Sequence, residues 1–235
     1  MTAVGPELAA LAGLLADETR AAMCLALLDK RAWTAGELAT LCGVARSTAS
    51  EHISKLVQGG LLDERRQGRH RYVRLADDDV ASLIETMSAH VRPAPVSGLR
   101  QHRASAALAR GRTCYDHLAG RLGVAITDAM TTRGLLRRDT GFALTDTGVD
   151  WFSELEISLP SSEKRPLVKP CLDWTERRDH LAGPAAAQLC LLVLERGWAV
   201  RIGSQRAVRV TPLGLAELRD HLGIEPAELN EDAPT

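Results

Sequence analysis

The feature that most constrains this chain is a run of two short helices, a glycine turn and an arginine-rich hairpin between residues 34 and 75. Thr34 and Glu37 have the spacing of a capping box, in which each side chain bonds to the backbone of the other residue, so a short helix is expected to begin there. Gly43 is expected to end that helix in a left-handed turn. A second helix then runs from about Arg46 to Gln58. Two short helices joined by a tight turn are the helix-turn-helix arrangement.

The second helix has one apolar and one polar face. Its apolar positions are Ala49, Ile53, Leu56 and Val57. The polar face offers hydroxyl, imidazole and basic groups, which in this geometry enter the major groove of DNA and bond to base edges and phosphates. The candidate reading residues are Arg46, Ser47, Thr48, Ser50, His52 and Lys55. We expect Arg46, Ser47, Ser50 and His52 to point outward together.

Strand-forming residues flank a turn at Gln67-Gly68 and predict a β-hairpin directly after the second helix. The basic side chains of this hairpin are Arg65, Arg66, Arg69, His70 and Arg71. A basic hairpin beside a reading helix is a wing, placed to grip phosphates or to enter the minor groove. The order helix, turn, helix, hairpin favours a wing over a hairpin whose arginines only improve solubility.

The reading helix and the wing resemble those of the ArsR/SmtB family, the arsenic-repressor family of winged helix-turn-helix regulators. The similarity lies in Ser47–Leu56, Gly60-Leu61 and the hairpin residues up to Leu75, within a span of roughly residues 8 to 91. The resemblance implies a homodimer that binds an inverted repeat in a double-stranded DNA operator, usually as a repressor that an inducer releases. It also implies that the first and last helices of the domain, the last from about Asp77 to Val91, form the dimer contact.

Two metal-site patterns of that family are missing from this segment. The stretch from Glu37 to Cys42 has one cysteine where the family has a Cys-x-Cys pair. The last helix has three aspartates at its start and then no histidine until His90. Cys24 and Cys42 are therefore expected to be small buried hydrophobic positions.

The second half of the chain contains an internal repeat. Asp116-His-Leu-Ala-Gly120 recurs as Asp179-His-Leu-Ala-Gly183, at an offset of 63 residues. Each copy predicts an apolar helix that begins at the Asp-His motif, then a short basic hairpin and a final helix capped by a threonine. Proline and glycine in the preceding segment predict a linker over residues 92–103.

The expected fold is therefore mainly α with small β-hairpin wings. It consists of an N-terminal winged helix-turn-helix domain over residues 1–91 and a C-terminal domain over residues 104–224, made of two helix-hairpin-helix repeats with a sensing role. A frayed acidic tail is expected over residues 225–235.

Four residues of the second half are candidates for metal or thiol chemistry: Cys114, His117, Cys171 and His180. The segments that begin at Cys114 and Cys171 resemble a C-terminal extension found in subsets of the ArsR family. Cys114 and His117 are expected to share a helix face and to bind a divalent metal ion, with Cys171 and His180 completing that site or forming a second pair. Cys114 and Cys171 are expected at non-equivalent positions of the repeat.

Two alternatives to that site stay open. The cysteines and histidines can instead be buried thiols and hydrogen-bonded helix caps. The effector can instead be a small organic molecule held between the repeats. The aromatic residues that would line such a site are Tyr115, Trp151 and Trp174.

Composition bounds the remaining classes. The net charge is −1, but residues 44–75 hold seven basic and three acidic side chains, as expected of a confined nucleic-acid footprint. No segment has the roughly 18 apolar residues of a membrane span and no signal peptide is evident, so a cytoplasmic protein without a membrane partner is expected. The common catalytic motifs are absent, and no enzyme is predicted. The alternatives to an inducer-released repressor are a winged helix that contacts only proteins, and a regulator that responds to metal or thiol oxidation.

Overall fold

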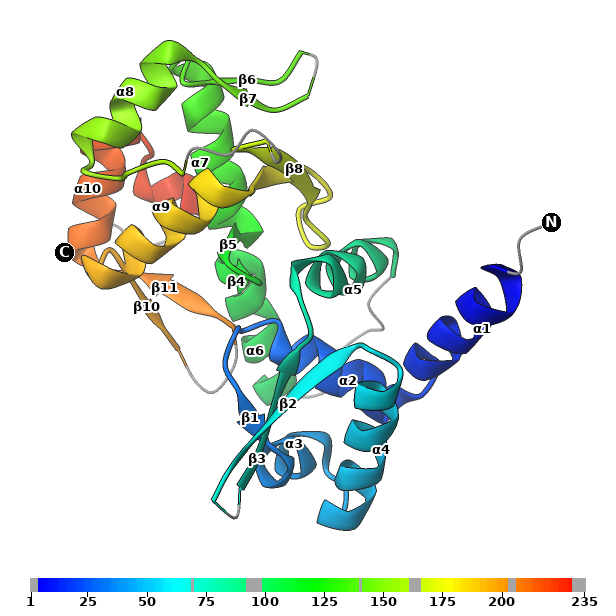
Figure 1. Cartoon of the computed structure of the whole chain (residues 1–235). Coiled ribbons are helices and arrows are strands. Elements are labelled where there is room, and N and C mark those ends of the chain that lie inside the picture. The colour runs from blue at the N-terminus through cyan, green and yellow to red at the C-terminus, as the bar shows by residue number, and fades with distance from the viewer. Residues whose placement is uncertain are drawn as a thin grey trace. The chain divides into compact units, whose positions relative to one another are not determined.

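The computed structural model describes residues 4–68, 70–91, 99–139, 141–160, 166–202 and 206–229 (Figure 1). The chain divides into two compact units, residues 1–85 and 86–235. No helix in these described ranges combines the length and the apolar character that a membrane crossing requires.

The described residues of the first unit form helices and a three-stranded sheet. Its elements are α1 (Val4–Leu15), α2 (Glu18–Leu27), β1 (Trp33–Thr34), α3 (Ala35–Cys42), α4 (Arg46–Gln58), β2 (Leu62–Gln67), β3 (His70–Leu75) and α5 (Asp78–His90), whose C-terminal end extends past the unit boundary. The strand order is β1-β3-β2, and both pairings are antiparallel. This confirms the predicted helix-turn-helix with a wing.

Local signals position α3 and α4 as predicted. The Glu37 N–H donates to Thr34 Oγ1 at 3.3 Å, and the Thr34 N–H donates to Glu37 Oε2 at 2.7 Å, so the capping box is present. Gly43 ends α3 with φ 66°, a conformation that favours glycine. The apolar face of α4 is buried through Ala49, Ile53 and Leu56, so its opposite face is left toward solvent.

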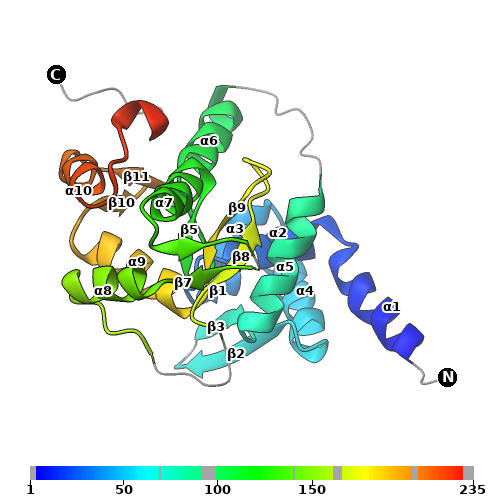
Figure 2. The same ribbon diagram turned by 90° about the horizontal axis from the view of Figure 1, so that it is seen from above.

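The second unit alternates helices with antiparallel two-stranded hairpins. Its elements are α6 (Leu99–Arg110), β4 (Arg112–Cys114), β5 (His117–Ala119), α7 (Gly120–Thr132), β6 (Leu136–Arg137), β7 (Ala143–Leu144), α8 (Asp146–Glu154), β8 (Lys169–Leu172), β9 (Asp179–Ala182), α9 (Pro184–Glu195), β10 (Ala199–Arg201), β11 (Val208–Val210), α10 (Pro212–Leu222) and the 3₁₀ helix η1 (Pro226–Leu229). Helix α7 packs against β9, and α9 packs against β5 (Figure 2). The helix of each half therefore contacts the hairpin of the other half.

Both halves of this unit run hairpin, helix, hairpin, helix. The final helices begin as predicted, because Thr145 and Thr211 accept from the N–H groups of Gly148 and Gly214. The prediction that a helix begins at each Asp-His motif is wrong, since both histidines lie in strands. Glycine separates strand from helix in each copy: Gly120 has φ 72° and Gly183 has φ 97°.

The two halves share one hydrophobic core, in which Met130 and Phe152 of the first half lie with Ala185 and Leu218 of the second. Leu229 of η1 belongs to the same core and is 2% exposed. The expectation of a frayed tail is therefore wrong for residues 225–229, because the burial of apolar side chains holds this segment in place. Residues 230–235 lie outside the described ranges. Residues 92–98 of the predicted linker also lie outside the described ranges. Residues 99–103 of the predicted linker belong to α6.

Candidate functional site

The outward face of α4 carries the candidate reading residues. Arg46, Ser47 and Lys55 are exposed, while Thr48 and Ser50 are half-buried. The Lys55 ammonium donates to Glu51 Oε1 at 2.7 Å, one turn away on the same helix. The N-terminal end of α4 thus presents Arg46 and Ser47 to solvent at the end where a recognition helix contacts bases.

His52 lies elsewhere than predicted. Its Nδ1 atom is 3.4 Å from Arg20 and 3.7 Å from Asp17, the N-cap of α2, and its side chain is 14% exposed. The prediction that His52 points outward with Ser47 is wrong, because residue 52 flanks the buried Ile53 and faces α2. His52 therefore connects α4 to α2.

The wing residues separate into two groups. Arg65, Arg66 and His70 are exposed, whereas Arg71 is half-buried. The Arg71 guanidinium donates to Glu64 Oε2 on the neighbouring strand at 2.6 Å and to Ser54 Oγ on α4 at 3.2 Å. Arg71 therefore connects the β2–β3 hairpin to α4. Arg69 lies outside the described residues.

The Cys and His candidates of the second unit lie on two hairpins. Cys114 is the register partner of His117 across β4–β5, and Cys171 is the register partner of His180 across β8–β9. The predicted helix face for Cys114 and His117 is therefore wrong. The expectation that the two cysteines occupy non-equivalent positions is also wrong, because the longer loop of the second hairpin alters the Cys–His spacing in sequence but not the pairing.

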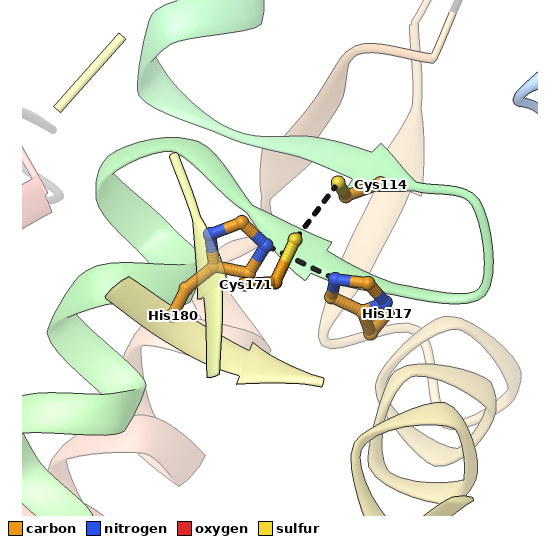
Figure 3. Close-up of side chains that lie close together, drawn as sticks. All are labelled: Cys114, His117, Cys171 and His180. Atoms are coloured by element: carbon orange, nitrogen blue, oxygen red, sulfur yellow. Dashed lines mark hydrogen bonds between the residues drawn. The ribbon is translucent and has the colours of Figure 1, made fainter. Parts of the chain in front are cut away.

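All four side chains converge on one point (Figure 3). One ligand atom from each, two Sγ and two ring nitrogens, lies within 4.8 Å of every other. The two Sγ atoms are 3.9 Å apart, and the Nε2 atoms of the two histidines are 3.0 Å apart. Tetrahedral zinc with ordinary bond lengths separates two sulfurs by about 3.8 Å and two nitrogens by about 3.3 Å. Cys114, His117 and His180 are buried and Cys171 is half-buried, so the donor set fits a closed tetrahedral metal site.

A carboxylate faces the far nitrogen of each ring. His117 Nδ1 lies 3.1 Å from Asp116 Oδ1, and His180 Nδ1 lies 3.3 Å from Asp173 Oδ2. Burial lowers the pKa of His180, but its contacts with Asp173 and Cys171 outweigh burial and raise it. A hydrogen bond from Cys114, supported by the two histidines, outweighs burial and lowers the pKa of Cys171, which favours the thiolate form that binds metals.

Comparison with known proteins decides the class of the chain. Residues 15–65 match a family model described as "Helix-turn-helix domain". Over 226 residues the chain is 38% identical to YdfF of Bacillus subtilis, an uncharacterized HTH-type transcriptional regulator, and the match covers 94% of this chain and 100% of that one. The chain belongs to the helix-turn-helix transcriptional regulators. This confirms the regulator class that the reading helix and the wing predicted, and the similarity to YdfF extends through the second unit.

Other relatives of the regulator match a smaller part of the chain. The biofilm growth-associated repressor of Agrobacterium fabrum is 32% identical over 83 residues, which is 35% of this chain and 70% of that one. A solved winged helix-turn-helix DNA-binding domain from Mycobacterium bovis, Mb0332 (fragment 1-100), is 28% identical with a TM-score of 0.34. The match covers 41% of this chain and 92% of the Mb0332 chain. That domain is described as homodimeric and as a possible ArsR-family regulator.

Sequence reasoning missed Asp173 of the regulator, which is fully buried beside the cluster. Its Oδ2 accepts from Arg112 at 2.9 Å and from the Gly120 N–H at 2.7 Å, and its Oδ1 accepts from Thr175 Oγ1 at 2.6 Å. Burial raises the pKa of Asp173, but the contacts with His180 and Arg112 outweigh it and hold the group ionised. Its proximity in sequence to Cys171 was the available signal.

Two other cysteines and two of the aromatic candidates of the regulator lie outside the Cys–His cluster. Cys24 is fully buried, and burial raises the pKa of its thiol to about 12. Cys42 is half-buried, and burial raises its pKa as well. Trp151 is packed against Phe152 in the core, and the Arg112 guanidinium lies 4.7 Å from the ring centroid of Trp174.

Proposed function

We propose that this regulator is a homodimeric repressor whose second unit binds one divalent metal ion of the zinc class, and that the ion releases the repressor from its operator. The convergence of Cys114, His117, Cys171 and His180 within 4.8 Å carries the proposal. Each half of the unit supplies one Cys–His pair, so the ion would link the two hairpins. The same pairing supports an origin of the unit by duplication of a hairpin-helix-hairpin-helix repeat.

The charge of the site selects the class of ion. Two thiolates and two neutral imidazoles carry two negative charges, which a divalent ion balances. Arg112 already neutralises Asp173 at 2.9 Å, so that carboxylate adds no uncompensated charge beside the site. A monovalent ion would leave a buried negative charge, which is costly. Mixed sulfur and imidazole donors in a tetrahedral array suit Zn²⁺ and its spectroscopic substitute Co²⁺.

The DNA-reading role is proposed for two surfaces of the first unit. On α4, the residues proposed to contact bases are Arg46, Ser47, Thr48, Ser50 and Lys55. On the wing, the residues proposed to contact phosphates are Arg65, Arg66, Arg69 and His70. His52 and Arg71 are proposed to hold the reading helix and the wing in place, since both make contacts within the unit.

Exposed apolar side chains on α1 and α5 support the homodimer. No residue of α1 is buried, and Val4 and Leu8 are each 62% exposed. Leu83 and Met87 of α5 are exposed as well. An apolar helix stripe normally packs against a partner, and a second copy is the partner that an inverted repeat calls for, with half-sites about 34 Å apart.

Metal stoichiometry tests the metal-binding part of the proposal. The protein is purified, loaded with Zn²⁺, freed of excess metal, and examined by elemental analysis and native mass spectrometry. We expect one Zn²⁺ per chain, and loss of the ion in Cys114→Ser and His180→Gln. Cys42→Ser, which changes a half-buried thiol in the other unit, is the matched control and should retain the ion. A wild-type protein that binds no Zn²⁺ would refute the metal site.

A response to thiol oxidation is the second candidate, favoured by the 3.9 Å separation of Cys114 Sγ and Cys171 Sγ. Hydrogen peroxide would take two electrons and two protons from these thiols, forming one S–S bond and two molecules of water. Mass spectrometry of the peroxide-treated, metal-free protein tests this. A Cys114–Cys171 disulfide that alters DNA affinity would support the redox role, and unmodified thiols would exclude it.

A further inference from the structure

We infer that Asp173 is a positioning residue of the proposed metal site, which holds the His180 ring with its proton on Nδ1 so that Nε2 is the ligand atom. The inference rests on the proposed metal function and adds a residue outside the four donors. It also assigns the ligand nitrogen of both histidines, because Asp116 stands in the same relation to His117.

The Asp173 carboxylate lies beside the His180 ring. His180 Nδ1 lies 3.3 Å from Asp173 Oδ2, and both side chains are fully buried. The two atoms are close, but their geometry is not that of a hydrogen bond, and within the described residues His180 Nδ1 has no hydrogen-bond partner. An ionised carboxylate only accepts, so the nitrogen beside it is the one that carries the ring proton. The remaining nitrogen, Nε2, then offers its lone pair toward His117.

Asp173 is itself held rigidly. Its two oxygens accept from Arg112, from the N–H of Gly120 at the start of α7, and from Thr175 through both hydroxyl and N–H. The paired guanidinium compensates the charge of the buried carboxylate. A carboxylate fixed by this many donors cannot turn away from the ring, so it restrains the orientation of the imidazole as well as its protonation.

Both histidine rings have a carboxylate beside Nδ1. His117 Nδ1 lies 3.1 Å from Asp116 Oδ1, so both Nδ1 atoms face carboxylates and both Nε2 atoms face each other at 3.0 Å. In the neutral form that binds a metal ion, rings with their protons on Nδ1 direct both Nε2 lone pairs at one point. A cation at that point accepts both lone pairs. The carboxylates therefore prepare the rings for a metal ion before it arrives.

Zinc affinity in matched variants tests this inference. Competition with a chromophoric chelator should show binding 10- to 100-fold weaker in Asp173→Asn, the range typical for loss of such a partner. Asp116→Asn should cause a smaller loss, because Asp116 is 25% exposed and water can replace it. The control is Asp128→Asn, since Asp128 is paired with Arg138 and Arg178 in the same unit and should leave the affinity unchanged.

Nitrogen-15 NMR of the histidine rings in zinc-loaded wild type supplies a readout that loss of structure cannot imitate. We expect the His180 proton on Nδ1 and the ion on Nε2. Coordination through Nδ1, or equal affinities for Asp173→Asn and Asp128→Asn, would overturn the inference and leave the metal site standing. A wild type without zinc overturns both. If Asp173→Asn does not fold, the wild-type NMR result decides alone.

Discussion

His117 and His180 approach each other through their Nε2 atoms at 3.0 Å, from hairpins that are 63 residues apart in the sequence. The approach joins the two halves of the second unit at the point where Cys114 and Cys171 also meet. Because each hairpin supplies one thiol and one imidazole, a bound ion would cross-link the halves. Binding of an ion at this point would therefore depend on the folded unit.

Ser47→Ala tests the reading helix. Ser47 is exposed at the N-terminal end of α4, so we expect the substitution to weaken operator binding by about 1–3 kcal/mol and binding to random duplex much less. Stability should change by less than about 0.5 kcal/mol, because the position is exposed. Gln58→Ala, at the other end of the same helix, is the control. Identical preferred sequences for wild type and Ser47→Ala in a binding selection would show that α4 is not the reader.

The wing is tested through the salt dependence of DNA affinity. Arg65→Ala and Arg66→Ala should each weaken all DNA sequences alike and flatten the salt slope by about one unit for the lost phosphate contact. The same outcome is expected for Arg69→Ala. Arg71→Ala should instead loosen the wing, because Arg71 bonds to Glu64 within the protein. Unchanged slopes in the variants of the two exposed arginines would remove the wing assignment.

Leu8→Glu tests the dimer. Leu8 is 62% exposed on α1, and a charge in an apolar interface should shift the protein from dimer to monomer in sedimentation velocity at micromolar concentration. Leu213→Glu is a matched control, because Leu213 is 50% exposed on α10 of the other unit. A wild type that is monomeric, or a Leu8→Glu variant that remains dimeric, would argue against α1 as the dimer contact.

The first unit could be predicted well because its signals are local. The Thr34–Glu37 spacing and Gly43 define α3 within a few residues, and the arginine-rich hairpin follows directly in sequence. His52 could not be placed, since its contact with Arg20 depends on how α2 packs against α4. Tertiary packing determines where the His52 side chain lies, and the spacing of apolar residues along α4 does not predict it.

For the second unit, the four Cys and His residues could be identified from the sequence, but their arrangement in space could not. A spacing of three between Cys114 and His117 suits a helix face and a tight hairpin equally, and the structure has the hairpin. The loop of the second hairpin is longer, so the number of residues between Cys and His differs between the two halves. The equivalence of Cys114 and Cys171 was therefore not visible in the sequence. Asp173 depends on partners from distant segments, Arg112 and Gly120, which only the folded chain brings together.

Metal removal should destabilise the second unit. An ion that binds only the folded state stabilises it by about 4 kcal/mol when free metal exceeds the dissociation constant by about 1,000-fold. Thermal unfolding followed by circular dichroism should therefore show a higher Tm with Zn²⁺ than after chelation. The difference should disappear in Cys171→Ser and persist in Cys42→Ser. Equal Tm values for loaded and chelated wild type would contradict a metal cross-link between the hairpins.

Operator affinity of the loaded and metal-free protein is the most direct test of the central claim. The operator is first obtained by binding selection, and fluorescence anisotropy then gives the Kd with Zn²⁺ and after chelation. We predict that Zn²⁺ weakens operator binding by about 5- to 150-fold, the usual range of coupling between two sites, and that His180→Gln abolishes the difference. The same Kd for the loaded and metal-free wild type would contradict the account, because the metal site would then have no bearing on DNA binding.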